Sequence, residues 1–177
     1  MIDQTQNKQQ STAKKGGRLV PALCNILGTL ILASVILSCL PLTIPRFLGY
    51  EIYEVVSGSM EPQIPVGSVI YVAPTAPEEI QENEIIAFWS GDSIITHRVM
   101  ENHLVEGEFV TKGDANAAED MREAPYDSLI GRVSRHIPVL GSLMALYTST
   151  VGKAYAVCFA ACGAMLNILA GRIRRNR

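Results

Sequence analysis

The feature that most constrains this chain is an uncharged run from Leu19 to Pro45, rich in Leu, Ile, Val and Ala. About 20 apolar residues are enough for a helix to cross the hydrocarbon core of a bilayer. A basic segment precedes the run, as it does in a cleavable signal peptide. The run is too long for such a peptide, however, and no small-x-small cleavage site follows promptly. We therefore expect a transmembrane helix over residues 19–45 that is retained after a basic N-terminal arm, residues 1–18.

A second uncharged run, Ala154 to Gly171, lies within the apolar region 137–171 and ends at a basic tail, residues 172–177. It predicts a second transmembrane helix at about 154–171; a helix lying on the membrane surface is the alternative. Both ends of the chain are basic next to apolar runs, and cytoplasmic loops carry an excess of Lys and Arg. We therefore expect a multi-pass protein of the cell membrane with both termini, including the arm 1–18 and the tail 172–177, in the cytoplasm.

Two crossings would place the segment between the helices, residues 46–136, outside the cytoplasm. Residues 46–135 hold six basic and sixteen acidic side chains, a net charge of −10, although the whole chain carries only −2. Such an acidic segment argues against nucleic acid as a partner, because binding it depends on neutralising phosphates. About 90 residues suffice for one small domain. All four cysteines lie in the apolar runs, so no disulfide is expected in this domain.

The middle segment has the pattern of short β-strands. Runs rich in Ile, Val, Tyr and Phe are separated by turn residues such as Pro65-Val66-Gly67 and Ser90-Gly91-Asp92. The expected strands are residues 51–56, 68–72, 84–89, 93–100, 104–111 and 129–134. The fold class that follows is mainly β, a small sheet or barrel between two transmembrane helices.

Three polar groups in this segment are the parts of a hydrolytic triad. Ser59 follows a strand in Ser57-Gly58-Ser59-Met60, His97 lies in a strand, and two carboxylates follow in Asp114 and Asp120. A triad is recognised by roles and geometry, so the order Ser, His, Asp is admissible. A serine at a loop entry or a histidine in a strand is by itself ordinary, and the carboxylates are what favour a catalytic site.

Three ordered motifs carry a resemblance to a known family. Residues 57–67 (SGSMEPQIPVG), 95–99 (ITHRV) and 111–120 (TKGDANAAED) resemble type I signal peptidase, in the branch that has histidine as the base and occurs in the endoplasmic reticulum, in archaea and in some Gram-positive bacteria. The resemblance spans roughly residues 20 to 170. It implies a compact β catalytic domain whose site lies close to the membrane surface.

The resemblance also implies roles for individual residues. Ser59 would be the nucleophile, His97 the general base and Asp120 the carboxylate that orients His97, while Asp114 would support the site. The Ser57 hydroxyl and the Ser59 backbone N–H would form the oxyanion hole. Two residues depart from the family pattern: Gln63 replaces the usual threonine and Ala115 replaces the usual asparagine. Neither change removes a triad group.

The expected function is removal of N-terminal signal peptides from exported preproteins by acyl-enzyme chemistry. The expected partners are the signal peptides of secretory preproteins and the lipid bilayer, with no nucleic acid; subunits of a secretion machinery are a further class that the sequence does not identify. No cofactor or metal is expected, since His103 and His136 look isolated. Ile52, Val55 and Ile95 are candidates to line pockets for small side chains.

Two alternatives remain at this stage. Lys112 could serve as the base of a Ser-Lys dyad, although lysine ordinarily holds its proton far above neutral pH, whereas imidazole does not. The chain could also be a non-catalytic, membrane-anchored β-domain that binds or assembles partners outside the cell, with the serine and histidine serving only the fold.

Overall fold

A computed structural model of the protein describes the backbone of residues 3–176 and the side chains of residues 19–176. The side chains of the basic arm predicted at residues 1–18 therefore lie outside the described part. The chain divides into two compact units. One holds the long helices up to Leu40 and from Tyr147 onward, and the other is a sheet domain, Pro41–Leu146.

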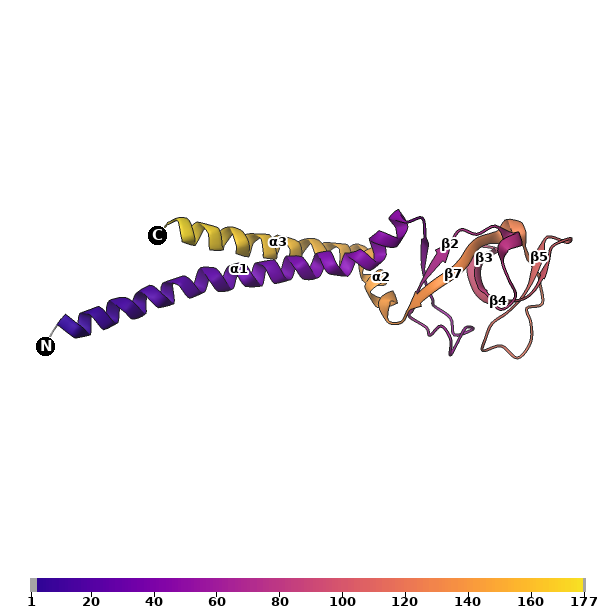
Figure 1. Cartoon of the computed structure of the whole chain (residues 1–177), viewed down its shortest axis with the longest axis horizontal. Coiled ribbons are helices and arrows are strands. Elements are labelled where there is room, and N and C mark those ends of the chain that lie inside the picture. Colours follow the sequence, from indigo (N-terminus) through magenta and orange to yellow (C-terminus); the bar gives the residue numbers. More distant parts are fainter. Residues whose placement is uncertain (1–2, 177) are drawn as a thin grey trace. The chain divides into compact units, whose positions relative to one another are not determined.

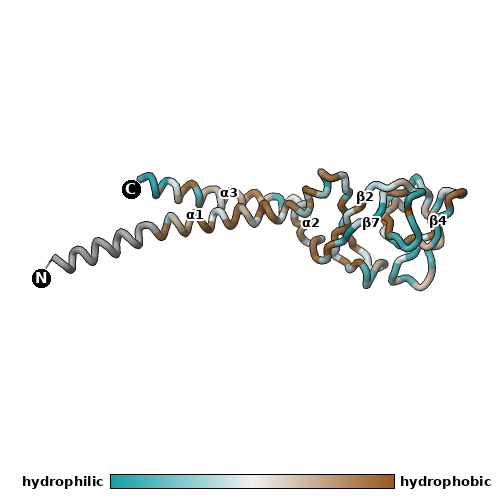
Figure 2. The backbone as a smooth tube through the Cα atoms, viewed as in Figure 1, coloured by the Kyte–Doolittle hydropathy of each residue, from teal (hydrophilic) through white to brown (hydrophobic). Residues whose placement is uncertain are grey.

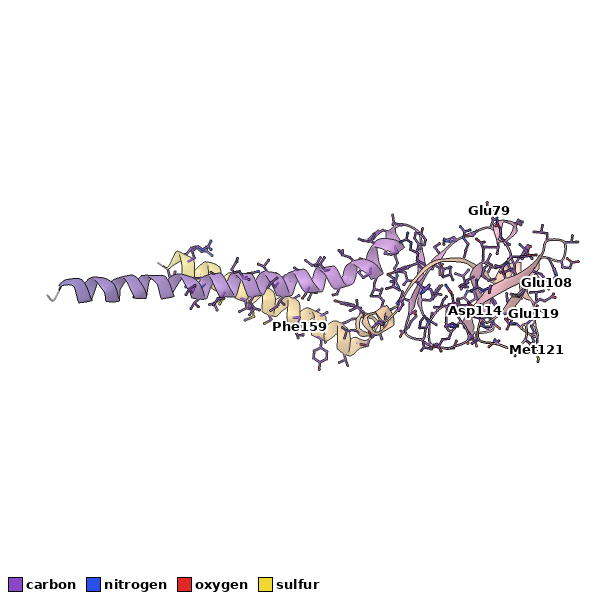
Figure 3. The ribbon with its side chains drawn as sticks, turned by 60° about the horizontal axis from the view of Figure 1, so that its bottom comes forward. Glu79, Glu108, Asp114, Glu119, Met121 and Phe159 are labelled. Atoms are coloured by element: carbon purple, nitrogen blue, oxygen red, sulfur yellow. The ribbon has the colours of Figure 1, made fainter. Side chains whose placement is uncertain are left out.

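Two long helices make up the first unit. Helix α1 spans Asp3–Phe47 and helix α3 spans Thr150–Arg175. Residues 19–47 and 150–175 are both long and apolar enough to cross a membrane, and apolar residues predominate along them in Figure 2. The two helices lie next to each other in Figure 1, cross in Figure 3, and approach closely at two glycines: a Cβ added to Gly28 would lie 2.6 Å from the carbonyl oxygen of Gly163. Small residues permit such close contacts between helices in membranes.

The second unit is built on one antiparallel sheet in the order β1-β2-β7-β3-β4-β5-β6. Its strands are β1 (Glu51–Glu54), β2 (Val69–Ala73), β3 (Ile85–Ser90), β4 (Ser93–His103), β5 (Glu108–Lys112), β6 (Ala124–Pro125) and β7 (Leu129–Ile137). Two short 3-10 helices, Pro77–Glu79 and Tyr126–Ser128, lie in its connections. The predicted fold class, a mainly β domain between two long apolar helices, is confirmed.

Strand β2 is buried on both faces. Ile70 and Val72 face one apolar cluster, which includes Met60 and Ile64, while Val69 and Tyr71 face another, which includes Leu140. Leu140 belongs to α2 (Leu140–Thr148), a short helix that is separate from α3. Ser149 lies between the two helices and is the N-cap of α3, because its side chain accepts a hydrogen bond from the N–H of Gly152.

Most strand boundaries differ from the sequence prediction by one to three residues, and the largest difference lies at one hairpin. Leu104 and Val105 were predicted to begin a strand, but they lie in the turn between β4 and β5, 62% and 93% exposed. Their apolar side chains mimic a strand pattern although they pack against nothing in the core. Strand β4 instead continues to His103. The sequence prediction also missed β6, because a two-residue strand has no periodicity to detect.

Candidate active site

The predicted nucleophile lies in a tightly held loop after β1. The chain leaves β1 at Glu54 and turns at Ser57–Met60, where the N–H of Glu61 donates to the carbonyl of Gly58 and that of Ile64 donates to Met60. Met60 is only 1% exposed and anchors the loop in the core. The neighbouring Ser59 keeps an accessible hydroxyl, 3.4 Å from the hydroxyl oxygen of Ser57.

The predicted base and orienting acid are in contact. Nδ1 of His97, a buried residue of β4, is hydrogen-bonded to Oδ2 of Asp120, which lies in the loop after β5. The hydroxyl of Thr111 donates to the same Asp120 oxygen at 2.7 Å. Thr111 was not predicted as a site residue, since a threonine in a strand normally serves packing. Only the folded arrangement reveals its contact.

The turn after β5 joins the serine loop to the histidine. The N–H of Ala115 donates to the carbonyl oxygen of Ser59 at 2.8 Å. A Cβ added to Gly113 would lie 2.7 Å from that same oxygen and 3.0 Å from Nε2 of His97. Glycine is therefore required at position 113, because any side chain would collide with both neighbours. Nε2, the ring nitrogen that faces away from Asp120, and the Ser59 carbonyl oxygen thus both lie next to Gly113.

Asp114 belongs to this turn but not to the histidine contact. Its carboxylate makes two hydrogen bonds with Arg98, from Nε at 2.8 Å and from Nη2 at 2.6 Å. Arg98 also donates to the carbonyl of Asn83. The hydrogen bond with Asp114 raises the pKa of Arg98, although partial burial acts in the opposite direction. Figure 3 shows Asp114 near the body of the sheet domain; its ion pair fastens the turn to β4.

A cleft of about 220 Å³ runs past Ser59 and His97. One wall consists of residues 54–57, 59, 60 and 64, and the other of residues 94–97 of β4. Val55 and Ile95 contribute to it, as the sequence suggested, but Ile52 does not. Ile52 is buried in the cluster with Val69 and Tyr71, because alternation along β1 directs it to the opposite face of the sheet from Val55.

Lys112 follows Thr111 on β5, and successive side chains of a strand point to opposite faces. Since Thr111 points toward Asp120, Lys112 points away from it. Lys112 is also not among the residues that line the cleft. This geometry gives Lys112 no direct access to the Ser59 hydroxyl.

The expectation that His103 is isolated was wrong. Its Nε2 lies 2.9 Å from a carboxylate oxygen of Glu101, and ligand atoms of His103, Glu108 and Glu123 lie within 4.8 Å of one another. The hydrogen bond with Glu101 raises the pKa of His103. These three residues are the set among the described side chains that could approach a cation; His103 and Glu108 are partly buried and Glu123 is exposed.

Comparison with known proteins identifies the family. No family model matches the chain. The catalytic subunit SEC11 of the signal peptidase complex from Clavispora lusitaniae is 32% identical over 117 residues, which cover 60% of this chain and 70% of that protein. The chain belongs to the signal peptidase I family. Another member of this family, signal peptidase I W of Bacillus subtilis, is 40% identical over 83 residues, 43% of this chain but only 42% of that protein. The SEC11 subunit of Scheffersomyces stipitis is 30% identical over 118 residues.

Proposed function

We propose that this protein is a membrane-bound serine endopeptidase that removes signal peptides from exported preproteins. The observation that carries the proposal is the arrangement of His97. One ring nitrogen contacts Asp120, while the other ring nitrogen and the Ser59 carbonyl oxygen both lie next to Gly113, and Ser59 and His97 line the same cleft. Membership in the signal peptidase I family supports the same reaction.

In the proposed mechanism Ser59 attacks the peptide carbonyl while Nε2 of His97 accepts its proton. Asp120 keeps the other imidazole proton on Nδ1 and stabilises the ring once both nitrogens are protonated. No hydrogen bond joins the Ser59 hydroxyl to His97 among the described contacts, and such bonds commonly tighten only when substrate binds.

The tetrahedral intermediate carries its negative charge on the former carbonyl oxygen. The Ser57 hydroxyl and the Ser59 backbone N–H are the proposed donors to this oxyanion. His97 then returns the proton to the leaving amine, which breaks the peptide bond and leaves an acyl group on Ser59. A water molecule, activated by His97 in the same way, releases the acyl group and restores the serine.

The cleft suits the residues that precede a signal-peptide cleavage site. Its volume of about 220 Å³ is below the roughly 300–1,000 Å³ of pockets for drug-sized ligands. Val55, Met60 and Ile64 are apolar and themselves buried, so the cleft favours small apolar side chains. Signal peptides carry small residues just before the cleaved bond, next to an apolar segment.

The proposed placement has both long helices crossing the membrane, both termini in the cytoplasm and the sheet domain outside. The last turn of α3 carries Arg172, Arg174 and Arg175, which supports a cytoplasmic C-terminus under the positive-inside rule. Secretory preproteins would then meet the cleft on the side of the membrane to which they are exported.

The deciding experiment incubates the full-length, detergent-solubilised protein with a preprotein and determines the new N-terminus. Ser59→Ala and His97→Ala should each abolish processing without unfolding the protein. Ser128→Ala, which removes an exposed hydroxyl bonded to the carbonyl of Pro125, is the matched control and should cleave normally. Near-normal cleavage by Ser59→Ala would refute the assignment.

The identity of the base has its own test. Lys112→Gln should keep most of the activity, whereas His97→Gln should lose it, because glutamine cannot accept the proton of Ser59. An inactive Lys112→Gln together with a fully active His97→Gln would replace the triad by a Ser-Lys dyad.

A further inference from the structure

Besides its contact with His97, Asp120 is held by two hydrogen bonds to one residue of β5. It lies in the loop between β5 and β6, outside regular structure, and its side chain is 22% exposed. Two hydrogen bonds fix it to Thr111: the N–H of Asp120 donates to the carbonyl of Thr111 at 2.8 Å, and the Thr111 hydroxyl donates to Oδ2 of Asp120 at 2.7 Å. Thr111 therefore holds both the backbone and the carboxylate of the loop residue.

The position of Thr111 is itself fixed by the sheet. It pairs with Val99 of β4, two residues beyond His97, and its side chain is completely buried. A buried hydroxyl requires a hydrogen-bond partner, and the partner here is the Asp120 oxygen that also contacts Nδ1 of His97. One oxygen of the Asp120 carboxylate is thus hydrogen-bonded to two side chains, His97 of β4 and Thr111 of β5.

Two donors on one oxygen define the rotation of the carboxylate. With the Thr111 hydroxyl removed, the contact with His97 alone among the described contacts would set that rotation. We propose that Thr111 is a positioning residue that orients Asp120 and, through it, keeps the His97 proton on Nδ1. The inference rests on the proposed roles of Asp120 and His97.

The proposal predicts different effects on activity for two substitutions of Thr111 that change its size only slightly. Thr111→Val preserves the branched shape in the buried site but removes the hydroxyl. Thr111→Ser keeps the hydroxyl and removes only a methyl group. A role in apolar packing alone would make the serine variant at least as harmful as the valine variant, whereas a positioning role predicts the reverse.

The kinetic test uses the full-length protein in detergent with a preprotein substrate. Thr111→Val should lower kcat by about tenfold to a hundredfold, the range that corresponds to one hydrogen bond to a charged group. Its KM should change little, because Thr111 does not line the cleft. Thr111→Ser should retain most of the rate. Thr75→Val, which removes a hydroxyl bonded to the carbonyl of Ala73, is the matched control and should behave as wild type.

A double-mutant comparison tests whether Thr111 acts through Asp120. In an Asp120→Asn protein, adding Thr111→Val should change kcat by less than about twofold, since the oriented carboxylate is already lost. A further loss as large as that in the wild-type background would overturn the proposal, as would an unimpaired Thr111→Val single variant. Should the valine variant not fold, Thr111→Ala takes its place in the same comparison.

A measurement independent of cleavage separates this inference from the proposed function. Nitrogen NMR of protein labelled at histidine should show His97 protonated at Nδ1 in the wild type and a mixture of tautomers in Thr111→Val. An unchanged tautomer would refute the role of Thr111 even in a fully active enzyme. If instead wild type and Ser59→Ala cleave equally, the proposed function fails, while the tautomer measurement still decides the role of Thr111.

Discussion

The ion pair between Asp114 and Arg98 gives a prediction whose size follows from its burial. The two side chains are 17% and 26% exposed and share two short hydrogen bonds. Breaking a fully buried pair costs roughly 3–5 kcal/mol, and a fully exposed pair contributes at most about 1 kcal/mol. For this intermediate exposure we expect Asp114→Asn to lower the free energy of unfolding of the sheet domain by about 1–3 kcal/mol. Each kcal/mol should lower Tm by roughly 4–8 °C in a domain near this size.

The same substitution should also slow catalysis, because the turn that Asp114 fastens supplies the Ala115 N–H to the Ser59 carbonyl. The assay pairs thermal unfolding of the detergent-solubilised protein with preprotein cleavage well below Tm. Glu84→Gln is the matched control: it disrupts the Glu84–Arg132 pair, in which Arg132 is 43% exposed, and should cost less than about 1 kcal/mol with cleavage intact. Equal losses of stability and rate in the two variants would refute the reasoning.

Three further predictions concern the turn, the acidic hairpin and the topology. Gly113→Ala should abolish cleavage, because the added methyl group would lie 2.7 Å from the Ser59 carbonyl oxygen and 3.0 Å from Nε2 of His97; normal cleavage by this variant would contradict the described contact. A hydrogen bond with Glu123 raises the pKa of Glu108 in the folded protein. Protonated Glu108 therefore stabilises the fold at low pH, and this stabilisation is lost as the pH rises through the pKa of Glu108 in the folded state. Glu108→Gln should reduce the decline of Tm with rising pH. Protease added to intact cells should digest the sheet domain and spare tags at both termini, and digestion of a C-terminal tag would overturn the proposed topology.

The fold was predictable where a sequence pattern has a physical cause within a few residues. The uncharged run beginning at Leu19 and the apolar strand around Val69 are read directly from composition and spacing. The pattern failed at Leu104 and Val105, because it cannot distinguish an apolar residue in a turn from one in a strand. It also failed at β6, which is held by pairing with β5 rather than by its own two residues.

The candidate site depended more on the family resemblance than on local patterns. His97 and Asp120 are 23 residues apart, and nothing in their spacing indicates that they touch. The contacts of Thr111 with Asp120 and of Arg98 with Asp114 were missed, because each depends on a partner brought close only by the fold, although Asp114 itself was predicted to support the site. Likewise, the approach of Glu108 and Glu123 to His103 depends on the pairing of β5 with β4 and β6, whereas Glu101 lies only two residues before His103 in the sequence.

The double burial of β2 has a consequence for how the domain opens. Apolar clusters cover both faces of the strand, and β1 and β7 pair with its two edges. No local fluctuation can expose the amides of Val69–Ala73 without separating a paired strand or lifting α2. Their hydrogen exchange should therefore proceed only through global opening, at the slowest rate in the domain. Deuterium uptake by this one peptide would report the free energy of unfolding of the whole sheet domain within the intact protein, in micelles or in a bilayer.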